Sequence, residues 1–249
     1  MHGRRANDPD DGAHGVTDLL LITGASRGIG RSTAELFAEM NYEVLNISRS
    51  PASHGSIVNH QIDLSDPNWA RDRGRAIREA ATGYDRIALI HNAGTLNKDS
   101  VRDLKSVDLL RVLQVNLVAA LQLNQLVLPL MKDGSSILYV GSTLSEMGVA
   151  GACSYVVAKH ALLGLMRATC QDLAGTGIHT ACICPGFTDT EMLREHMGGS
   201  GETLAAIASG IAFGRLIEPD EIARTLLFCA ENPVINGAVL HVNLGQLHR

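Results

Sequence analysis

The chain has few aromatic residues and no surplus of positive charge. Only 4% of its 249 residues are aromatic, and 21 Lys and Arg stand against 26 Asp and Glu, a formal net charge of −5. A dedicated nucleic-acid-binding protein normally carries a basic surplus or a basic stripe, so the charge argues against that class. Few aromatics together with 25 glycines predict an aliphatic core with many tight turns, typical of a parallel sheet covered by helices.

The cysteines lack the number and the spacing of a disulfide framework or a metal site. There are five, an odd number, and they are scattered along the chain, so we expect reduced thiols in a cytoplasmic protein. Cys182 and Cys184 lie two apart in the apolar run 178–184, which favours packing within a strand. No second Cys or His pair completes a tetrahedral set, and no metal site is predicted.

Uninterrupted hydrophobic runs of membrane-spanning length are also missing. Residues 1–16 are polar and contain no apolar segment of a secretory signal, so we expect a flexible tail before a single domain over 17–249. The most apolar stretch, 107–131, is interrupted by arginine, glutamine and asparagine. It therefore predicts a buried or interface helix rather than a membrane span.

Segments with the pattern of strands alternate with segments of helical spacing along the whole chain. We expect strands at 18–23, 43–48, 57–64, 86–91, 136–140, 178–184 and 238–242. We expect helices at 29–40, 66–81 (with Asp66 as N-cap and Pro67 in the first turn), 106–131, 152–173 and 219–231. This alternation predicts an α/β fold, a doubly wound, seven-stranded parallel sheet with helices on both faces. Residues 187–213 are irregular and form a candidate mobile lid.

A glycine-rich turn follows the first expected strand. Residues 23–30 read TGASRGIG, and an expected helix begins directly after the turn. Glycines let the backbone turn sharply and approach a ligand closely, and free N–H groups at a helix N-terminus favour a phosphate. Such turns are common on structural grounds alone, but this position on the first strand of an alternating series is typical of nucleotide binding.

The turn resembles the cofactor motif of classical short-chain dehydrogenases/reductases. Further motifs of that family follow in order: HNAG at 91–94, Asn116, Ser142, a YxxxK pattern at 155–159 and a Pro-Gly pair at 185–186. The resemblance covers about residues 18–242. It implies a Rossmann fold and an oxidoreductase that transfers a hydride between a nicotinamide cofactor and a carbonyl or secondary alcohol.

Tyr155 and Lys159 are four residues apart on an expected helix, so they share one face. The lysine ammonium stabilises a phenolate, which lets Tyr155 protonate a carbonyl oxygen or accept the proton of an alcohol. The resemblance assigns Ser142, with Ser145 as its rival, to orient the substrate oxygen, and Asn116 to a water-linked proton relay. The structural alternatives are a core amide at Asn116 and an ordinary tyrosine beside a solvated lysine.

The resemblance also predicts cofactor contacts residue by residue. Lys159 is expected to bond the nicotinamide ribose, and Asp63 and Leu64 to meet the adenine. The full expected set is Gly24, Ser26, Arg27, Gly28, Ile29, Gly30, Ser48, Arg49, Asp63, Leu64, Asn92, Ala93, Gly94, Tyr155, Lys159, Pro185, Gly186, Thr188 and Thr190.

The end of the second expected strand indicates which dinucleotide binds. An NAD-type site has an Asp or Glu there, whereas this chain has Ser48 followed by Arg49, with Arg27 in the nearby turn. Two guanidiniums with no carboxylate between them suit the 2′-phosphate of NADP(H), which we therefore predict. The alternatives are an NAD-dependent alcohol dehydrogenase of the same family and a catalytically silent dinucleotide-binding regulatory protein.

Three features depart from the family pattern. His91 stands where the family usually has asparagine, so its hydrogen bonds are open. Residues 50–56 are too short for the helix usually found between the second and third strands. The ending HVNLGQLHR replaces the common VDGG type, which leaves the contacts of the last strand open.

The identity of the substrate and the preferred reaction direction are not indicated. Members that act on acyl-carrier substrates tend to have basic residues before the fifth and sixth strands, where this chain has Lys132 as its sole firm cation. We therefore expect a free small-molecule carbonyl or alcohol. Helices 106–131 and 152–173 are too apolar for burial on one side, and in the family such helices pair between subunits. We expect a homodimer or homotetramer that binds neither nucleic acid nor membrane.

Overall fold

The computed structural model describes residues 17–198 and 200–246, and the expected tail 1–16 lies outside them. The strands are β1 Asp18–Thr23, β2 Glu43–Ser48, β3 Ile57–Gln61, β4 Arg86–His91, β5 Ser136–Val140, β6 His179–Pro185 and β7 Val239–Val242. The α-helices are α1 Gly28–Glu39, α2 Trp69–Ala80, α3 Ser106–Leu113, α4 Ala119–Val127, α5 Cys153–Asp172, α6 Glu191–Met197, α7 Gly201–Ala208 and α8 Pro219–Glu231. A π-helical segment, Gln114–Val118, joins α3 to α4.

The strands form one parallel sheet in the order β3-β2-β1-β4-β5-β6-β7, which confirms the predicted fold class. The chain builds outward from β1 to β3 and then returns to place β4 on the other side of β1. In open α/β sheets a reversal of this kind opens a crevice at the carboxyl ends of the strands, where ligands bind. The topology therefore places the expected site beside the loops that follow β1 and β4.

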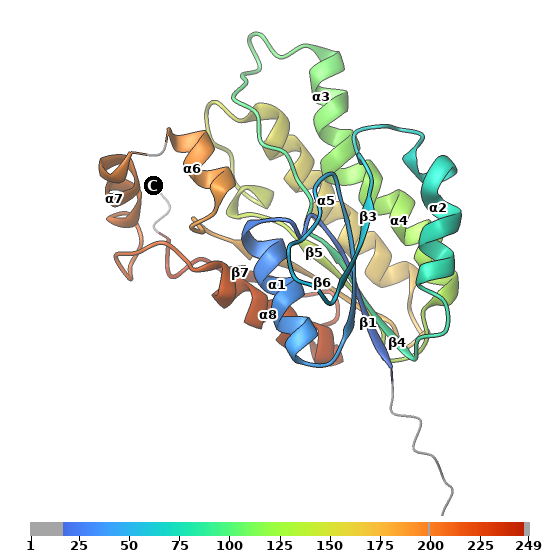
Figure 1. Ribbon diagram of the computed structural model, residues 1–249. Coiled ribbons are helices and arrows are strands. Elements are labelled where there is room, and N and C mark those ends of the chain that lie inside the picture. Colours follow the sequence, from blue (N-terminus) through green and yellow to red (C-terminus); the bar gives the residue numbers. More distant parts are fainter. Residues whose placement is uncertain (1–16, 199, 247–249) are drawn as a thin grey trace, which may run out of the picture.

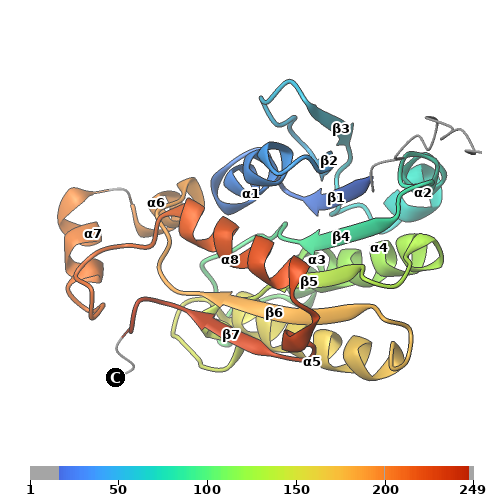
Figure 2. The ribbon, with the colours of Figure 1, turned by 90° about the horizontal axis from the view of Figure 1, so that it is seen from below.

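Both faces of the sheet are covered because the strands are apolar on both sides. Along β1, Leu19 and Leu21 pack with α2, α4 and α5, whereas Leu20 and Ile22 pack with α1 and α8. Figures 1 and 2 show these two layers of helices on opposite faces of the sheet. This double burial explains why the strands read as continuous apolar runs instead of alternating with polar residues.

The third strand and the helix after it begin and end differently from the prediction. A strand over 57–64 was expected, but β3 ends at Gln61, which pairs with Ser48, the last residue of β2. As an edge strand it has one neighbour and stops where that neighbour stops. Residues 66–68 form a turn in which the Asp66 carboxylate accepts from the Asn68 N–H at 2.9 Å, so α2 begins at Trp69. As expected, no helix lies between β2 and β3.

The expected helix 106–131 is one helical stretch over Ser106–Leu130 with a π-helical turn inside it. By length and composition alone it could cross a membrane, with a mean hydropathy of 1.3 and 39% of the window buried. In this structure Ala119, Leu123 and Val127 of α4 pack into the core on one face of the sheet. That packing is the role of a core helix in an α/β layer.

The expectation that residues 187–213 are irregular is wrong. They contain α6 and α7, which lie together beyond the carboxyl ends of the strands (Figures 1 and 2). The Thr190 hydroxyl caps α6 by accepting from the Leu193 N–H at 3.3 Å, and Gly198, with φ +79°, ends it. The segment contains two short capped helices, of which α6 lines the crevice.

Candidate active site

A cavity of about 1240 Å³ opens at the carboxyl ends of the strands. Its volume exceeds the roughly 300–1,000 Å³ that is usual for one small molecule. Loops after β1, β2, β4, β5 and β6 line it, as does α6. Every residue predicted from the sequence as a cofactor contact lies on its wall, and so do three of the four predicted catalytic residues: Ser142, Tyr155 and Lys159.

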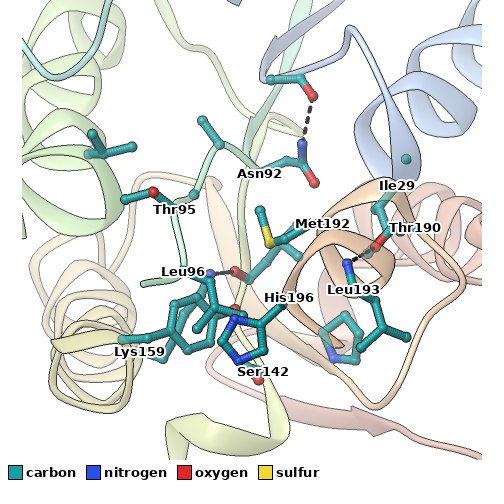
Figure 3. Close-up of a pocket in the computed structure, with 18 of the residues that line it drawn as sticks. Ile29, Asn92, Thr95, Leu96, Ser142, Lys159, Thr190, Met192, Leu193 and His196 are labelled. Atoms are coloured by element: carbon teal, nitrogen blue, oxygen red, sulfur yellow. Dashed lines mark hydrogen bonds between the residues drawn. The ribbon is translucent and has the colours of Figure 1, made fainter. Parts of the chain in front are cut away.

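The glycine turn is held in shape by two side-chain amides. The Asn92 side-chain N–H₂ donates to the carbonyls of Thr23 and Gly24, both at 3.0 Å (Figure 3). The Ala25 N–H donates to the side-chain carbonyl of Asn46 at 3.0 Å. The turn passes so close to α1 that a Cβ on Gly30 would lie 2.2 Å from the Gly24 carbonyl oxygen. Asn92 is thus a support of the turn through its side chain.

Asn46 was not predicted from the sequence. It is 1% exposed, and its amide group also donates to Ser48 at 2.9 Å and to Asn59 at 2.8 Å. The available signal was an asparagine inside the otherwise apolar strand EVLNIS, where an unpaired amide would be costly.

The N-terminus of α1 is open toward the cavity. The helix begins at Gly28, whose φ is +53°, and Arg27 at its N-cap makes no capping hydrogen bond. The first N–H groups of a helix have no partner within it and carry the positive end of its dipole. The donors therefore suit the pyrophosphate of a dinucleotide, which fits the predicted cofactor class.

Tyr155, Lys159 and Ser142 meet at the other end of the cavity. Lys159 is 3% exposed, and its Nζ donates to the Val140 carbonyl at 2.7 Å and lies 5.4 Å from the centroid of the Tyr155 ring. Val140 ends β5 and Ser142 follows it, so the strand carries the serine and anchors the lysine. Figure 3 shows Ser142, Lys159 and the α6 residue His196, which line the same cavity.

The structure separates Ser142 from its rival. Ser142 lines the cavity, and its hydroxyl caps a 3₁₀ turn by accepting from the Leu144 N–H at 3.1 Å. Ser145 is 1% exposed, and its hydroxyl accepts from the Ser142 N–H at 3.1 Å. Ser142 is therefore the serine placed to meet a substrate, and Ser145 holds its backbone.

The helix that carries Tyr155 is anchored by Asp99, which was not predicted. The Asp99 carboxylate accepts from the Ser154 N–H at 2.9 Å and from the Ser154 hydroxyl. Ser154 is fully buried and directly precedes Tyr155. Because the two partners are 55 residues apart, no local pattern marks Asp99.

Asn116 lies in the π-helical segment, and its side chain binds the backbone of Thr95. Its carbonyl accepts from the Thr95 N–H at 2.7 Å and its N–H₂ donates to the Thr95 carbonyl at 2.9 Å. These bonds use one N–H and one oxygen lone pair of the amide, so the other N–H and lone pair stay free of them and the proton-relay role stays a prediction. The π turn changes the backbone hydrogen bonding at this point, a feature that recurs at functional sites.

The region expected to discriminate between dinucleotides contains one group that was not predicted. Arg49 is exposed on the cavity wall, but the Arg27 guanidinium is bound by the Glu195 carboxylate of α6, at 2.6 and 3.3 Å. The sequence predicts no carboxylate between the two arginines, and the structure adds Glu195, from a distant part of the chain, as a partner of Arg27. The Ser48 hydroxyl donates to the Ser50 carbonyl at 2.5 Å.

Asp63, the expected adenine contact, also lies on the wall, and Leu64 is buried beside it. The hydrogen bond from the Ser65 backbone N–H lowers the pKa of the Asp63 carboxyl below its usual value.

The remaining expected cofactor contacts lie between the end of β6 and the start of α6, on the cavity wall. The Thr188 hydroxyl donates to the Gly186 carbonyl at 3.1 Å, and the Gly186 N–H donates to the Val242 carbonyl at 2.9 Å. A Cβ on Gly186 would lie 2.9 Å from the side chains of Asn243 and Gln246. The unusual chain ending therefore packs directly on the Pro-Gly pair.

His91 points away from the cavity into the core. It is 5% exposed, and its Nε2 lies 2.7 Å from the Asn124 side-chain oxygen. The Asn124 N–H₂ donates to the Tyr139 hydroxyl at 2.7 Å, which lies 3.0 Å from the Thr169 hydroxyl. Burial lowers the pKa of His91 from 6.5 to about 4. The histidine is thus a neutral member of a buried polar chain.

The buried, neutral His91 gives a prediction for the stability of the protein in acid. Between pH 6.5 and about 4 the unfolded chain binds a proton at His91 and the folded chain does not. The contribution of His91 to the free energy of unfolding is therefore fully present above pH 6.5. It falls by about 3 kcal/mol as the pH drops to 4. In urea unfolding across this range, native protein should lose this increment relative to His91→Asn. Parallel pH profiles for the two proteins would contradict the assignment.

Comparison with known proteins agrees with this geometry. The family model described as Enoyl-(Acyl carrier protein) reductase matches residues 24–246. The chain belongs to the short-chain dehydrogenase/reductase family. It is 30% identical to a 3-oxoacyl-(acyl-carrier-protein) reductase of Vibrio cholerae over 92% of this chain and 96% of that protein. It is 29% identical to carbonyl reductase family member 4 of Xenopus tropicalis over 92% and 98%.

A solved structure shows the same fold. The crystal structure of a short-chain dehydrogenase family protein from Francisella tularensis superposes with a TM-score of 0.86 at 24% identity, covering 92% of this chain and 98% of that one. Together with the family match, this places the protein among the short-chain oxidoreductases of Rossmann fold.

Proposed function

We propose that this short-chain dehydrogenase/reductase uses NADP(H) to interconvert a carbonyl and a secondary alcohol, with Tyr155 as general acid and base. The observation that carries the proposal is the convergence of Ser142, Tyr155 and Lys159 on the same cavity that the glycine turn enters. The turn supplies phosphate donors and the other end supplies groups for proton transfer. One bound dinucleotide together with a substrate accounts for both ends of the cavity.

The chain's own residues then perform three tasks. When bound, the cofactor supplies or accepts the hydride. Ser142 donates a hydrogen bond that orients the substrate oxygen. Tyr155 gives its phenolic proton to that oxygen in reduction and takes it back in oxidation. Lys159 is held by the Val140 carbonyl, so its charge stabilises the negative charge that develops on the tyrosine.

Substrate class is the open part of the proposal. The segments before β5 and β6, used above to argue against an acyl-carrier partner, lie at the amino ends of those strands, away from the cavity. Lys132 there lies 3.5 Å from Asp85. The similarity to a 3-oxoacyl-(acyl-carrier-protein) reductase favours testing acyl-carrier thioesters beside free carbonyls.

The test is the consumption of NADPH and NADH with a panel of free ketones, aldehydes and a 3-oxoacyl-carrier thioester. Turnover of at least one carbonyl with NADPH supports the proposal, and a higher rate with NADH favours the NAD-dependent alternative. Tight dinucleotide binding without turnover of any carbonyl or alcohol would favour the catalytically silent alternative.

We also propose a homo-oligomer. Val107, Leu110, Leu121 and Val157 on α3, α4 and α5 are between 42% and 64% exposed. Large apolar side chains exposed on these three helices support an interface with a second copy of the chain. Light scattering at micromolar concentration should give a multiple of the 26.5 kDa chain mass. A monomer mass would contradict the proposal.

A further inference from the structure

Helix α6 places two carboxylates against the phosphate-binding turn. Its first residue, Glu191, has a carboxylate oxygen 3.6 Å from the position of a Cβ built on Gly28. One turn later, Glu195 binds the Arg27 guanidinium through both carboxylate oxygens, at 2.6 and 3.3 Å. The two acids share one face of the helix because they are four residues apart. This face bridges the cavity from the lid to the N-terminus of α1.

The neighbouring residues of α6 have other partners. Arg194 binds Asp189 at 2.7 Å through two nitrogens, which closes the start of the helix on itself. His196 and Met192 face the cavity near Ser142 (Figure 3). The Arg27–Glu195 pair is therefore a contact between the lid helix and the turn that receives the phosphates.

The Arg27–Glu195 ion pair is exposed, so a competing anion can displace Glu195. The side chains of Arg27 and Glu195 are 47% and 63% exposed, and exposed ion pairs contribute little to stability. A phosphate dianion carries more charge than a carboxylate and matches the guanidinium fork equally well. Glu195 is bound to both terminal nitrogens of Arg27, so a 2′-phosphate that binds these two nitrogens displaces Glu195, whereas a 2′-hydroxyl leaves the pair intact.

We propose that Glu195 is a cofactor-specificity residue, which competes with the 2′-phosphate of NADP(H) for Arg27 and so lowers the preference for NADP(H) over NAD(H). The inference rests on the proposed cofactor. It also makes the docking of α6 depend on the dinucleotide, because the lid helix keeps its contact with the turn when NAD(H) binds and loses it when NADP(H) binds.

The test is to measure the binding of NADPH and NADH to native protein and to Glu195→Gln, with no substrate present. Binding is monitored through the fluorescence of the reduced nicotinamide. We expect the affinity for NADPH to rise roughly two- to fivefold, the factor for removing one exposed ion pair. The affinity for NADH should stay the same or fall. Glu202→Gln, an equal charge change on exposed α7, is the matched control and should alter neither.

A second variant separates competition from a general change of charge. In an Arg27→Gln background, Glu195→Gln should no longer raise the affinity for NADPH, because the shared partner is gone. Equal changes for NADPH and NADH, or a gain that persists without Arg27, would overturn the inference while leaving the proposed function intact. Failure of native protein to bind either dinucleotide would overturn the proposed function and this inference together.

Discussion

Tyr155→Phe is expected to lower kcat for carbonyl reduction by about 10²–10⁴-fold, the range for loss of a general acid. The substitution removes one hydroxyl and keeps the ring that lies 5.4 Å from the Lys159 ammonium, so the cavity wall stays in place. Cofactor affinity should change little. The measurement is a comparison of kcat and NADPH affinity for the two proteins with the best carbonyl of the panel.

Tyr84→Phe is the matched control for this variant. Its hydroxyl donates to Glu43 at 2.6 Å. Tyr84 lies just before the amino end of β4, whereas the cavity lies at the carboxyl ends of the strands. It should retain native kcat. Loss of general acid catalysis lowers the rate by about a hundredfold or more. If Tyr155→Phe kept more than about a tenth of native activity, the role given to Tyr155 would be contradicted.

Four of the strands that are buried on both faces were predictable to the residue, whereas β6, expected at 178–184, lies one residue later at His179–Pro185. β1, β2, β4 and β5 match their expected bounds, because an apolar run bordered by turn residues leaves little choice of start and end. β3 was predicted too long because its end is set by its only neighbour in the sheet and not by its own residues. Pairing partners along a parallel sheet are distant in sequence, so local patterns do not contain this information.

The sequence signal for α6 lies in its capping residues. Thr190 as N-cap and Gly198 in the left-handed region bracket a seven-residue helix, and both residue types are standard at these positions. A helix that short carries too few apolar residues to show a clear period. Caps were therefore the better evidence for α6 than hydrophobic spacing.

In the site, the motif residues were predictable and their supports were not. Ser142, Tyr155 and Lys159 follow family spacing, and the structure brings them to one cavity. Asp99 and Glu195 act on residues 55 and 168 positions away, so only the folded chain relates them. Asn116 was predicted by position, but its side chain turned out to be bonded to Thr95 on both sides.

Arg49→Asp is expected to reverse the cofactor preference of the enzyme. Native protein should favour NADPH over NADH by about tenfold or more in kcat/KM, because a charge-assisted phosphate contact contributes about 1.5–3 kcal/mol. The substitution removes that contact and places a carboxylate where it repels a 2′-phosphate and accepts from a 2′-hydroxyl. The ratio of the two kcat/KM values should fall by about a hundredfold.

Arg49 is the better choice than Arg27 for this experiment. Arg27 is shared with Glu195, so its loss also frees a carboxylate and α6. Within residues 17–198 and 200–246, Arg49 makes no ion pair, and its charge is available on the cavity wall. Arg73 is exposed on α2, so Arg73→Asp is the control for the change in net charge. It should leave the ratio of the two kcat/KM values unaltered. Preference of the native enzyme for NADH, or an Arg49→Asp ratio equal to that of the control, would show that the 2′-phosphate is not read at this corner of the cavity.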